Sequence, residues 1–181
     1  MTNTKTTDLA LILKALEFAA TKHKDQRRKD VNASPYINHP IALANVLCNE
    51  GGIEDHRVIC AALLHDTIED TETIPEELEE QFGKEIMMIV VEVSDDKTLS
   101  KAERKTLQIE HARHASKEAK LVKLADKISN LRDIHFTPPV GWSNEMKIEY
   151  FEWAKLVIDQ VRGSSSKLES VFDEIYAQKV T

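Results

Sequence analysis

Glycine and proline are both scarce, with 5 residues of each in a chain of 181. These residues mark turns, and alternation of apolar and polar residues is also nearly absent, so the sequence favours helices joined by short loops. No apolar run approaches the roughly 18 residues that a membrane span needs. The segment from Met1 to Asp8 is polar and lacks the apolar centre of a signal peptide. We therefore expect an all-α protein with a cytoplasmic location and no membrane partner.

Cysteine and positive charge are also in short supply. Cys48 and Cys60 each lie in an apolar helical pattern without CxxC spacing, which favours buried thiols over a disulfide or a zinc site. The formal net charge of −7 argues against a nucleic-acid partner, because that role needs a basic face. An anionic small molecule would need a local basic cluster. One is present: Lys22, Lys24, Arg27, Arg28 and Lys29.

The length suits one domain with a sizeable core, and no shift in composition marks a second. We expect a single domain over residues 1–181, with its core between about 9 and 176. Residues 84–93 are compatible with a buried strand or a helix, and we prefer the helix because a strand there would stand alone. Capping and stop signals predict helices over about Leu9–Lys24 with Asp8 as cap, Pro40–Gly51, Asp55–Asp70, Thr73–Gly83 with Glu76 completing a capping box, 84–93, Ser100–Ala115 with a Glu103 capping box, Ser116 to beyond Leu131, Ser143–Val161 and Ser166–Tyr176.

The stretch from His65 to Asp70 follows an apolar run, residues 58–64, that has the length and Ala/Leu content of a buried helix. Neighbours on a helix are about 100° apart, so His65 and Asp66 can both face one metal ion. Glu69 and Asp70 fall four residues later on the same flank. The sequence thus predicts one continuous helix with a metal-binding tier and a carboxylate tier beside it.

Two more residues extend the metal-binding tier. His39 precedes Pro40, which suits the first turn of a helix and places His39 at its entrance. Asp126 lies beside an apolar helical stripe, together with Asn130, and an aspartate there is costly unless something pairs with it. The resulting set suits Mn²⁺, Fe²⁺ or another octahedral ion with open positions, and it looks catalytic because it lacks thiolates. Its members are His39, His65, Asp66 and Asp126.

Each of these residues also has a simpler interpretation. A lone histidine is usually a satisfied polar group, and Glu69 with Asp70 could be a solvated acidic helix end. The helix dipole disfavours acids at a C-terminus by about a few tenths of a kcal/mol or more, which suggests that this pair has a role. His111 and His114 are three residues apart and could bind a metal, but without a nearby acid partner we expect them on an exposed face. His23, His56 and His135 receive the same interpretation.

The stretches around these residues carry a resemblance to a known family. They are Arg27–Asp30, Pro35–Pro40, Ala61–Asp70, Asp95–Leu99 and Leu121–Asp133. Together they resemble the stand-alone Mesh-type small alarmone hydrolases, HD-domain relatives of the hydrolase half of RelA/SpoT proteins. The likeness extends from about Leu9 to Tyr176. The His-Asp pair alone is a weak motif, whereas the whole set is highly specific.

The resemblance implies a single HD-domain helical bundle and a Mn²⁺-dependent enzyme of the stringent response, with one ion per active site. It would remove the 3′-pyrophosphate of guanosine 3′,5′-bis(diphosphate) (ppGpp) or of the pentaphosphate, giving GDP or GTP. By matching position, the metal ligands would be His39, His65, Asp66 and Asp126, and the catalytic pair Glu69 and Asp70. The substrate contacts would be Arg28, Lys29, Ser34, Tyr36, Lys101 and Asn130.

One departure concerns Met146. Relatives can carry an arginine near this position for the far phosphate, whereas the nearest basic side chain here is Lys147. Two other functions stay open at this point: a phosphatase acting on another nucleotide, such as the 2′-phosphate of NADPH, and a non-catalytic module that binds alarmones. The intact ligand set and acidic pair argue against the second, because a sensor needs neither.

Overall fold

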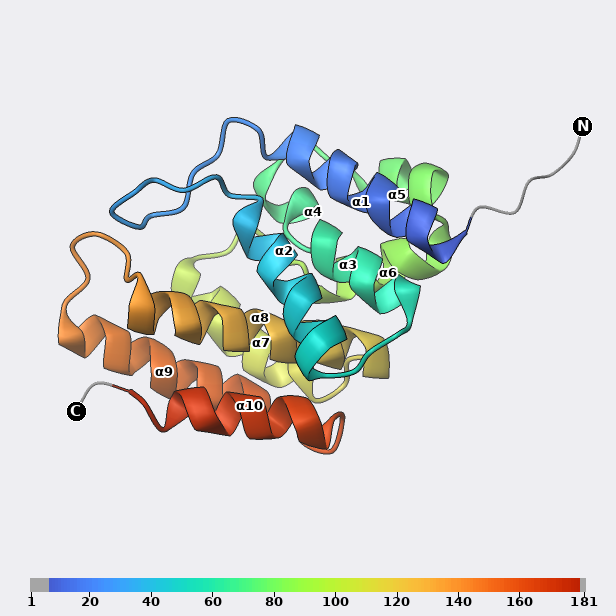
Figure 1. Cartoon of the computed structure of the whole chain (residues 1–181). Helices are drawn as coiled ribbons and strands as arrows, with labels where there is room; N and C mark the ends of the chain where they lie inside the picture. Colours follow the sequence, from blue (N-terminus) through green and yellow to red (C-terminus); the bar gives the residue numbers. More distant parts are fainter. Residues whose placement is uncertain (1–6, 180–181) are drawn as a thin grey trace, which may run out of the picture.

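A computed structural model describes residues 7–179, and within that range the chain is all helical, as predicted (Figure 1). The β-structure found there is one isolated bridge between Arg27 and Pro35. None of the described helices is long and apolar enough to cross a membrane. The helices are α1 (Asp8–Lys22), α2 (Asn38–Asn45), the π-helical turn η1 (Val46–Glu50), α3 (His56–Leu64), α4 (Thr67–Asp70), α5 (Pro75–Phe82), α6 (Lys84–Val93), α7 (Lys101–Ala112), α8 (Lys117–Phe136), α9 (Asn144–Asp159) and α10 (Ser166–Tyr176).

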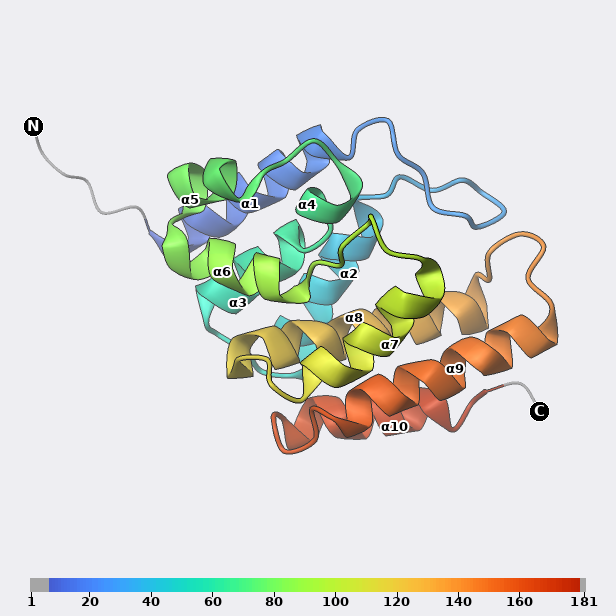
Figure 2. The same ribbon diagram turned by 180° about the vertical axis from the view of Figure 1, so that it is seen from behind.

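Helix α3 occupies the centre of the bundle. Every residue from Val58 to Leu64 is buried, as its Ala/Leu-rich sequence predicts. It packs against α1, α2, α6 and α8. Seen from behind, α7 lies in front of α8, and α9 and α10 lie below them (Figure 2). Helix α3, which His65 directly follows, and α8, which carries Asp126, are therefore packed against each other inside the protein.

The predicted continuous helix over the central stretch is wrong. Helix α3 ends at Leu64, His65 and Asp66 form a turn, and α4 is a single turn from Thr67 to Asp70. Side chains bind the carbonyls at this break: Nδ1 of His65 lies 2.8 Å from the oxygen of Ala62, and the Thr67 hydroxyl donates to the Leu64 oxygen at 2.7 Å. These bonds compete with the backbone ladder and redirect the chain.

Helix starts were predicted correctly where a serine caps them. Ser100 and Glu103 form the expected capping box, and Ser116 and Ser143 cap α8 and α9. Two other assignments are wrong. Thr7 caps α1 in place of Asp8. Helix α5 starts at Pro75 without a side-chain cap, because the residue at its N-cap is Ile74, while the Thr73 hydroxyl bonds with that of Thr71 at 2.8 Å.

Some single-residue expectations also changed. His39 is the second residue of α2, so it lies in the first turn, at the helix entrance as expected, although its own backbone is already helical. His23 is buried, with its ring packed on Tyr36 and its Nδ1 2.7 Å from Oε1 of Gln26, while its Nε2 has no hydrogen-bond partner among the described residues. His56 and His135 are half-buried. The expected exposed face of His111 and His114 is confirmed, and both cysteines are free thiols, with Cys60 buried and Cys48 half-buried.

Gly51 ends η1 at a point too tight for a side chain. A Cβ there would lie 2.8 Å from the Leu47 oxygen and 2.9 Å from Cδ2 of Leu168 on α10. We expect Gly51→Ala to lower the free energy of unfolding by about 1–3 kcal/mol, because overpacking forces neighbours apart. Urea denaturation measures this change. The exposed control Ser170→Ala should change it by less than about 0.5 kcal/mol, and equal stability of both variants would contradict the close packing.

Candidate active site

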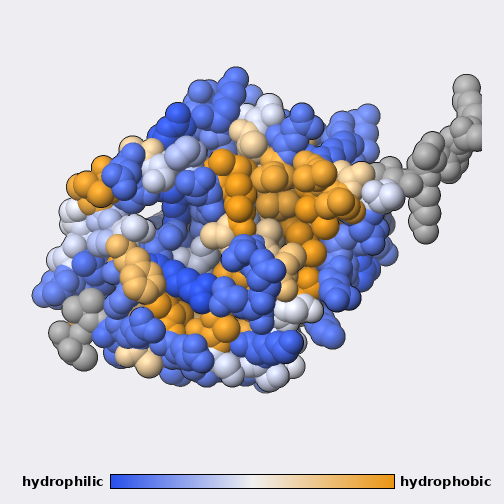
Figure 3. Space-filling model, viewed as in Figure 1, coloured by the Kyte–Doolittle hydropathy of each residue, from blue (hydrophilic) through white to orange (hydrophobic). Residues whose placement is uncertain are grey.

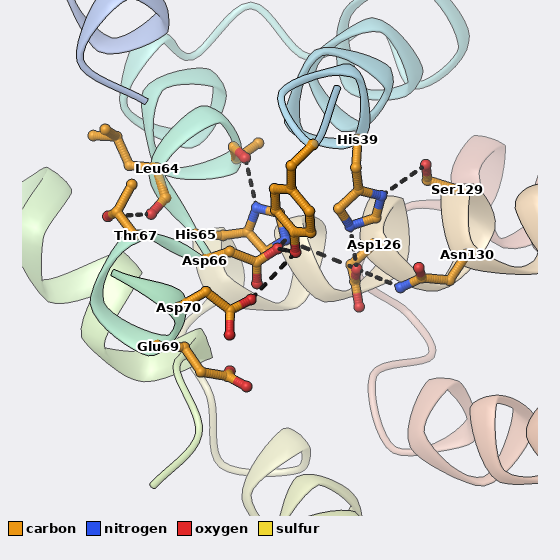
Figure 4. A network of polar contacts seen from close by, with 12 residues as sticks. His39, Leu64, His65, Asp66, Thr67, Glu69, Asp70, Asp126, Ser129 and Asn130 are labelled. Carbon is orange, nitrogen blue, oxygen red and sulfur yellow. Dashed lines mark hydrogen bonds and ion pairs between the residues drawn. The ribbon is translucent and has the colours of Figure 1, made fainter. Parts of the chain in front are cut away.

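Three of the predicted metal ligands converge from separate elements: His39 from α2, His65 from the turn after α3, and Asp126 from α8 (Figure 4). One ligand atom from each lies within 4.8 Å of the others. Oδ1 of Asp126 is 3.2 Å from Nε2 of His39 and 3.9 Å from Nε2 of His65. This spacing brings two imidazoles and a carboxylate to one point, as a single cation requires.

The far ring nitrogens of both histidines are held by the protein. Nδ1 of His65 contacts the Ala62 oxygen at 2.8 Å, and Nδ1 of His39 contacts Oγ of Ser129 at 3.4 Å. Partners of this kind fix the ring orientation of metal-binding histidines. Nε2 of His65 is buried and faces two carboxylates, with Oδ2 of Asp66 at 2.9 Å and Oδ1 of Asp126 at 3.9 Å. An imidazole nitrogen in that state fits a metal ligand.

Asp66 lies at the edge of this triad. Its Oδ2 is 2.9 Å from Nε2 of His65 and accepts a hydrogen bond from the hydroxyl of Tyr36. Burial lowers the pKa of His65, but Asp66 and Asp126 outweigh it and raise that pKa to about 9. Burial opposes ionisation of Asp66 too, yet His65 and His39 hold its pKa well below the usual range. The site stabilises positive charge at its centre, which fits a divalent cation.

Glu69 and Asp70 lie together on α4 and share a cation. Nζ of Lys97 is 3.1 Å from Oε1 of Glu69 and 2.6 Å from Oδ1 of Asp70. Glu69 also accepts from Arg104 at 3.3 Å and from the backbone N–H of Asp95 at 3.2 Å. Burial, and then the nearby charge of Asp95, raise the pKa of Glu69. The pair is therefore held rigidly beside the triad.

A cavity of about 720 Å³ opens beside the triad and the acidic pair. It is visible as a hydrophilic hollow between the loop after α1 and helices α8 and α9 (Figure 3). Its wall contains His39 and Asp70 and most of the residues predicted to contact the substrate. Those are Arg28, Lys29, Ser34, Tyr36 and Asn130. Lys101 is exposed at the start of α7 and does not line the cavity, and neither do Met146 and Lys147.

Sequence reasoning missed several residues of this cavity. Lys97 lay in one of the recognised stretches but received no role, and Trp142 and Tyr150 gave no signal beyond their size. Asp133 also lines the cavity and forms an ion pair with Arg28, whose guanidinium lies 5.7 Å from the ring centre of Tyr36. The amide of Asn130 donates to Oδ1 of Asp126 at 2.7 Å, which connects the cavity wall to the candidate metal ligands.

The comparisons with known proteins agree with this geometry. Residues 15–147 match the HD domain family. "Guanosine-3′,5′-bis(diphosphate) 3′-pyrophosphohydrolase MESH1" of Xenopus tropicalis is 57% identical, with 93% of this chain and 94% of the relative covered. The Homo sapiens protein of that name is 51% identical, with 95% and 96% covered.

A solved structure extends the comparison to the fold. It is described as "A metazoan ortholog of SpoT hydrolyzes ppGpp and plays a role in starvation responses". It superposes with a TM-score of 0.90 at 48% identity, covering 93% of this chain and 95% of the other. The fold and site define an HD-domain protein of the metal-dependent type. Within that class, the chain belongs to the MESH1 family, which confirms the family resemblance seen in the sequence.

Proposed function

We propose that this protein hydrolyses the 3′-pyrophosphate of ppGpp and of the pentaphosphate, releasing GDP or GTP and intact pyrophosphate. One observation carries the proposal: a rigid acidic pair lies beside a His/His/Asp triad at a cavity with basic walls. Relatives that share 51–57% of the sequence over nearly its whole length bear the name of this activity.

The proposed metal ligands are His39, His65, Asp66 and Asp126, and the proposed ion is one Mn²⁺. The mixed nitrogen and oxygen donor set without thiolate supports such an ion. When bound, the ion would polarise a phosphoryl oxygen and lower the pKa of water. The Tyr36 hydroxyl would hold Asp66 in place, as it does in the structure.

The residues around the ion would have separate roles in catalysis and substrate binding. Glu69 or Asp70 would orient the attacking water and accept its proton. Lys97 and Arg104 keep both carboxylates fixed. Charge on the transferring group is stabilised mainly by electrostatics. Phosphate oxygens would therefore lie along the wall formed by Arg28, Lys29, Ser34 and Asn130, with Tyr36 at its inner end. Lys101 does not line the cavity and stays a prediction.

The proposal is tested by the product. Protein freed of metal with a chelator should be inactive, and added Mn²⁺ should restore turnover of ppGpp to GDP. Orthophosphate should appear only when an inorganic pyrophosphatase is added, because pyrophosphate leaves intact. Orthophosphate released without that enzyme, and no pyrophosphate, would contradict the proposal. A parallel incubation with NADPH tests the alternative substrate, for which orthophosphate is the expected product.

Lys29 provides a test of the basic wall. It is exposed and lines the cavity, so Lys29→Ala should raise KM for ppGpp while leaving kcat and bound metal near wild type. Hydrogen bonds to charged groups are worth about 1.5–3 kcal/mol, so the rise should be about tenfold or more. The effect should shrink at high salt, which screens the lost attraction. Lys24→Ala, an exposed lysine outside the cavity wall, is the matched control. Equal KM values for both variants would place the phosphates elsewhere.

A further inference from the structure

Gln108 on α7 does not line the main cavity, yet its side-chain amide makes hydrogen bonds in two directions. Its Oε1 accepts from Nζ of Lys127 at 3.1 Å. Its Nε2 donates to Oδ2 of Asp95 at 2.7 Å. Each of these partners contacts a residue of the proposed active site, one a metal ligand and the other the acidic pair.

The hydrogen bond between Gln108 and Lys127, called here the Lys127 arm, connects Gln108 to Asp126. Lys127 is only 4% exposed, and its Nζ donates to Oδ2 of Asp126 at 2.9 Å. The same ammonium lies 4.5 Å from the ring centre of Trp153, which packs over it. Oδ2 of Asp126 is thus fixed from behind, while Oδ1 faces His39. With Gln108 and Trp153 on its other sides, the lysine has little freedom to move away from the carboxylate.

The hydrogen bond between Gln108 and Asp95, called here the Asp95 arm, connects Gln108 to Glu69. The backbone N–H of Asp95 donates to Oε2 of Glu69 at 3.2 Å. Arg104 donates to Oε1 of Glu69 at 3.3 Å and lies 3.9 Å from Oδ2 of Asp95. The position of Asp95 therefore sets where Glu69 lies, and Gln108 holds the carboxylate of Asp95 from α7.

An amide suits this place between a cation and an anion. It presents an acceptor to Lys127 and a donor to Asp95 at once, whereas a carboxylate offers acceptors alone and an apolar side chain offers neither. We infer that Gln108 is a positioning residue that couples the metal ligand Asp126 to the acidic residue Glu69 through α7. The expected effect on kcat rests on the proposed function, whereas the expected effect on Mn²⁺ affinity does not.

Two substitutions separate the arms. Gln108→Met keeps the length and removes both bonds, so Mn²⁺ affinity and kcat should each fall about 10- to 100-fold, as is typical for residues that orient metal ligands. KM should stay near wild type, because Gln108 is outside the cavity wall. Gln108→Glu keeps an acceptor for Lys127 but repels Asp95, so it should retain Mn²⁺ affinity and lose kcat. Thr106→Ala, exposed on the same helix, should change neither quantity.

The measurements are titration of the metal-free protein with Mn²⁺, followed by the free-ion paramagnetic resonance signal, and steady-state kinetics with ppGpp. Circular dichroism checks that each variant is folded, and Gln108→Glu tests the inference even where the methionine variant unfolds. Wild-type affinity and kcat in Gln108→Met would overturn the coupling. So would equal loss of Mn²⁺ affinity in both variants. If the wild type binds Mn²⁺ without hydrolysing ppGpp, the proposed function fails, while the affinity pattern still tests the Lys127 arm.

Discussion

Asp126→Asn should abolish tight Mn²⁺ binding and activity while the protein stays folded. Asn keeps the volume and one acceptor oxygen but removes the anionic ligand that faces both histidines. Asp126→Ala should lose the metal equally and also unfold more easily, by about 3–5 kcal/mol, because it leaves the buried ammonium of Lys127 without the acceptor oxygen that Asn keeps at this position. Elemental analysis gives the metal content.

Thermal unfolding provides a second readout of the same prediction. Added Mn²⁺ should raise the unfolding midpoint of the wild type, since a ligand that binds the native state stabilises it. It should leave the midpoints of both Asp126 variants unchanged. Asp66→Ala belongs in this series, because Asp66 is not one of the three residues whose ligand atoms all lie within 4.8 Å of one another. Full Mn²⁺ occupancy in Asp66→Ala would remove this residue from the ligand set, and full occupancy in Asp126→Asn would refute the site.

Glu69→Gln and Asp70→Asn should keep the fold and the bound metal but lose turnover. Loss of a proton-transfer group typically lowers the rate by about 10² to 10⁴. Both substitutions keep the shape of the side chain and an acceptor oxygen for Lys97, whose ammonium bridges the two carboxylates in the wild type. The effect should therefore appear in kcat. Steady-state kinetics and metal analysis on the same preparations measure it.

Two different results would contradict the prediction that Glu69 and Asp70 act in turnover. A rise in KM with normal kcat at saturation would make the pair substrate-binding residues. Loss of metal as complete as in Asp126→Asn would place them among the ligands. Lys97→Met is the informative companion, because it removes the shared cation and leaves both carboxylates in place. It should reduce kcat less than either acidic variant, since it disturbs their position and not their chemistry.

Much of the fold follows from interactions that are local in the sequence. Ser100 caps a helix by bonding to a residue three positions later, and Glu103 returns the bond. Such contacts depend on a few neighbouring residues, so the sequence is enough to predict them. The buried run of α3 follows equally from its apolar composition. The candidate metal ligands lie within the stretches that resemble the family, so their identity also follows from the sequence.

The tertiary structure decided the rest, because the contacts concerned join distant residues or competing local bonds. Thr67 and His65 take carbonyls of α3 and break the helix, an outcome that periodicity does not encode. The bond from Lys97 to Asp70 spans 27 positions, and that from Arg28 to Asp133 spans 105. Which side chains meet over such separations depends on how whole helices pack. The sequence by itself therefore determined an all-helical chain and the identity of its reactive groups, whereas packing determined how the acidic pair, its cations and the metal ligands are held together.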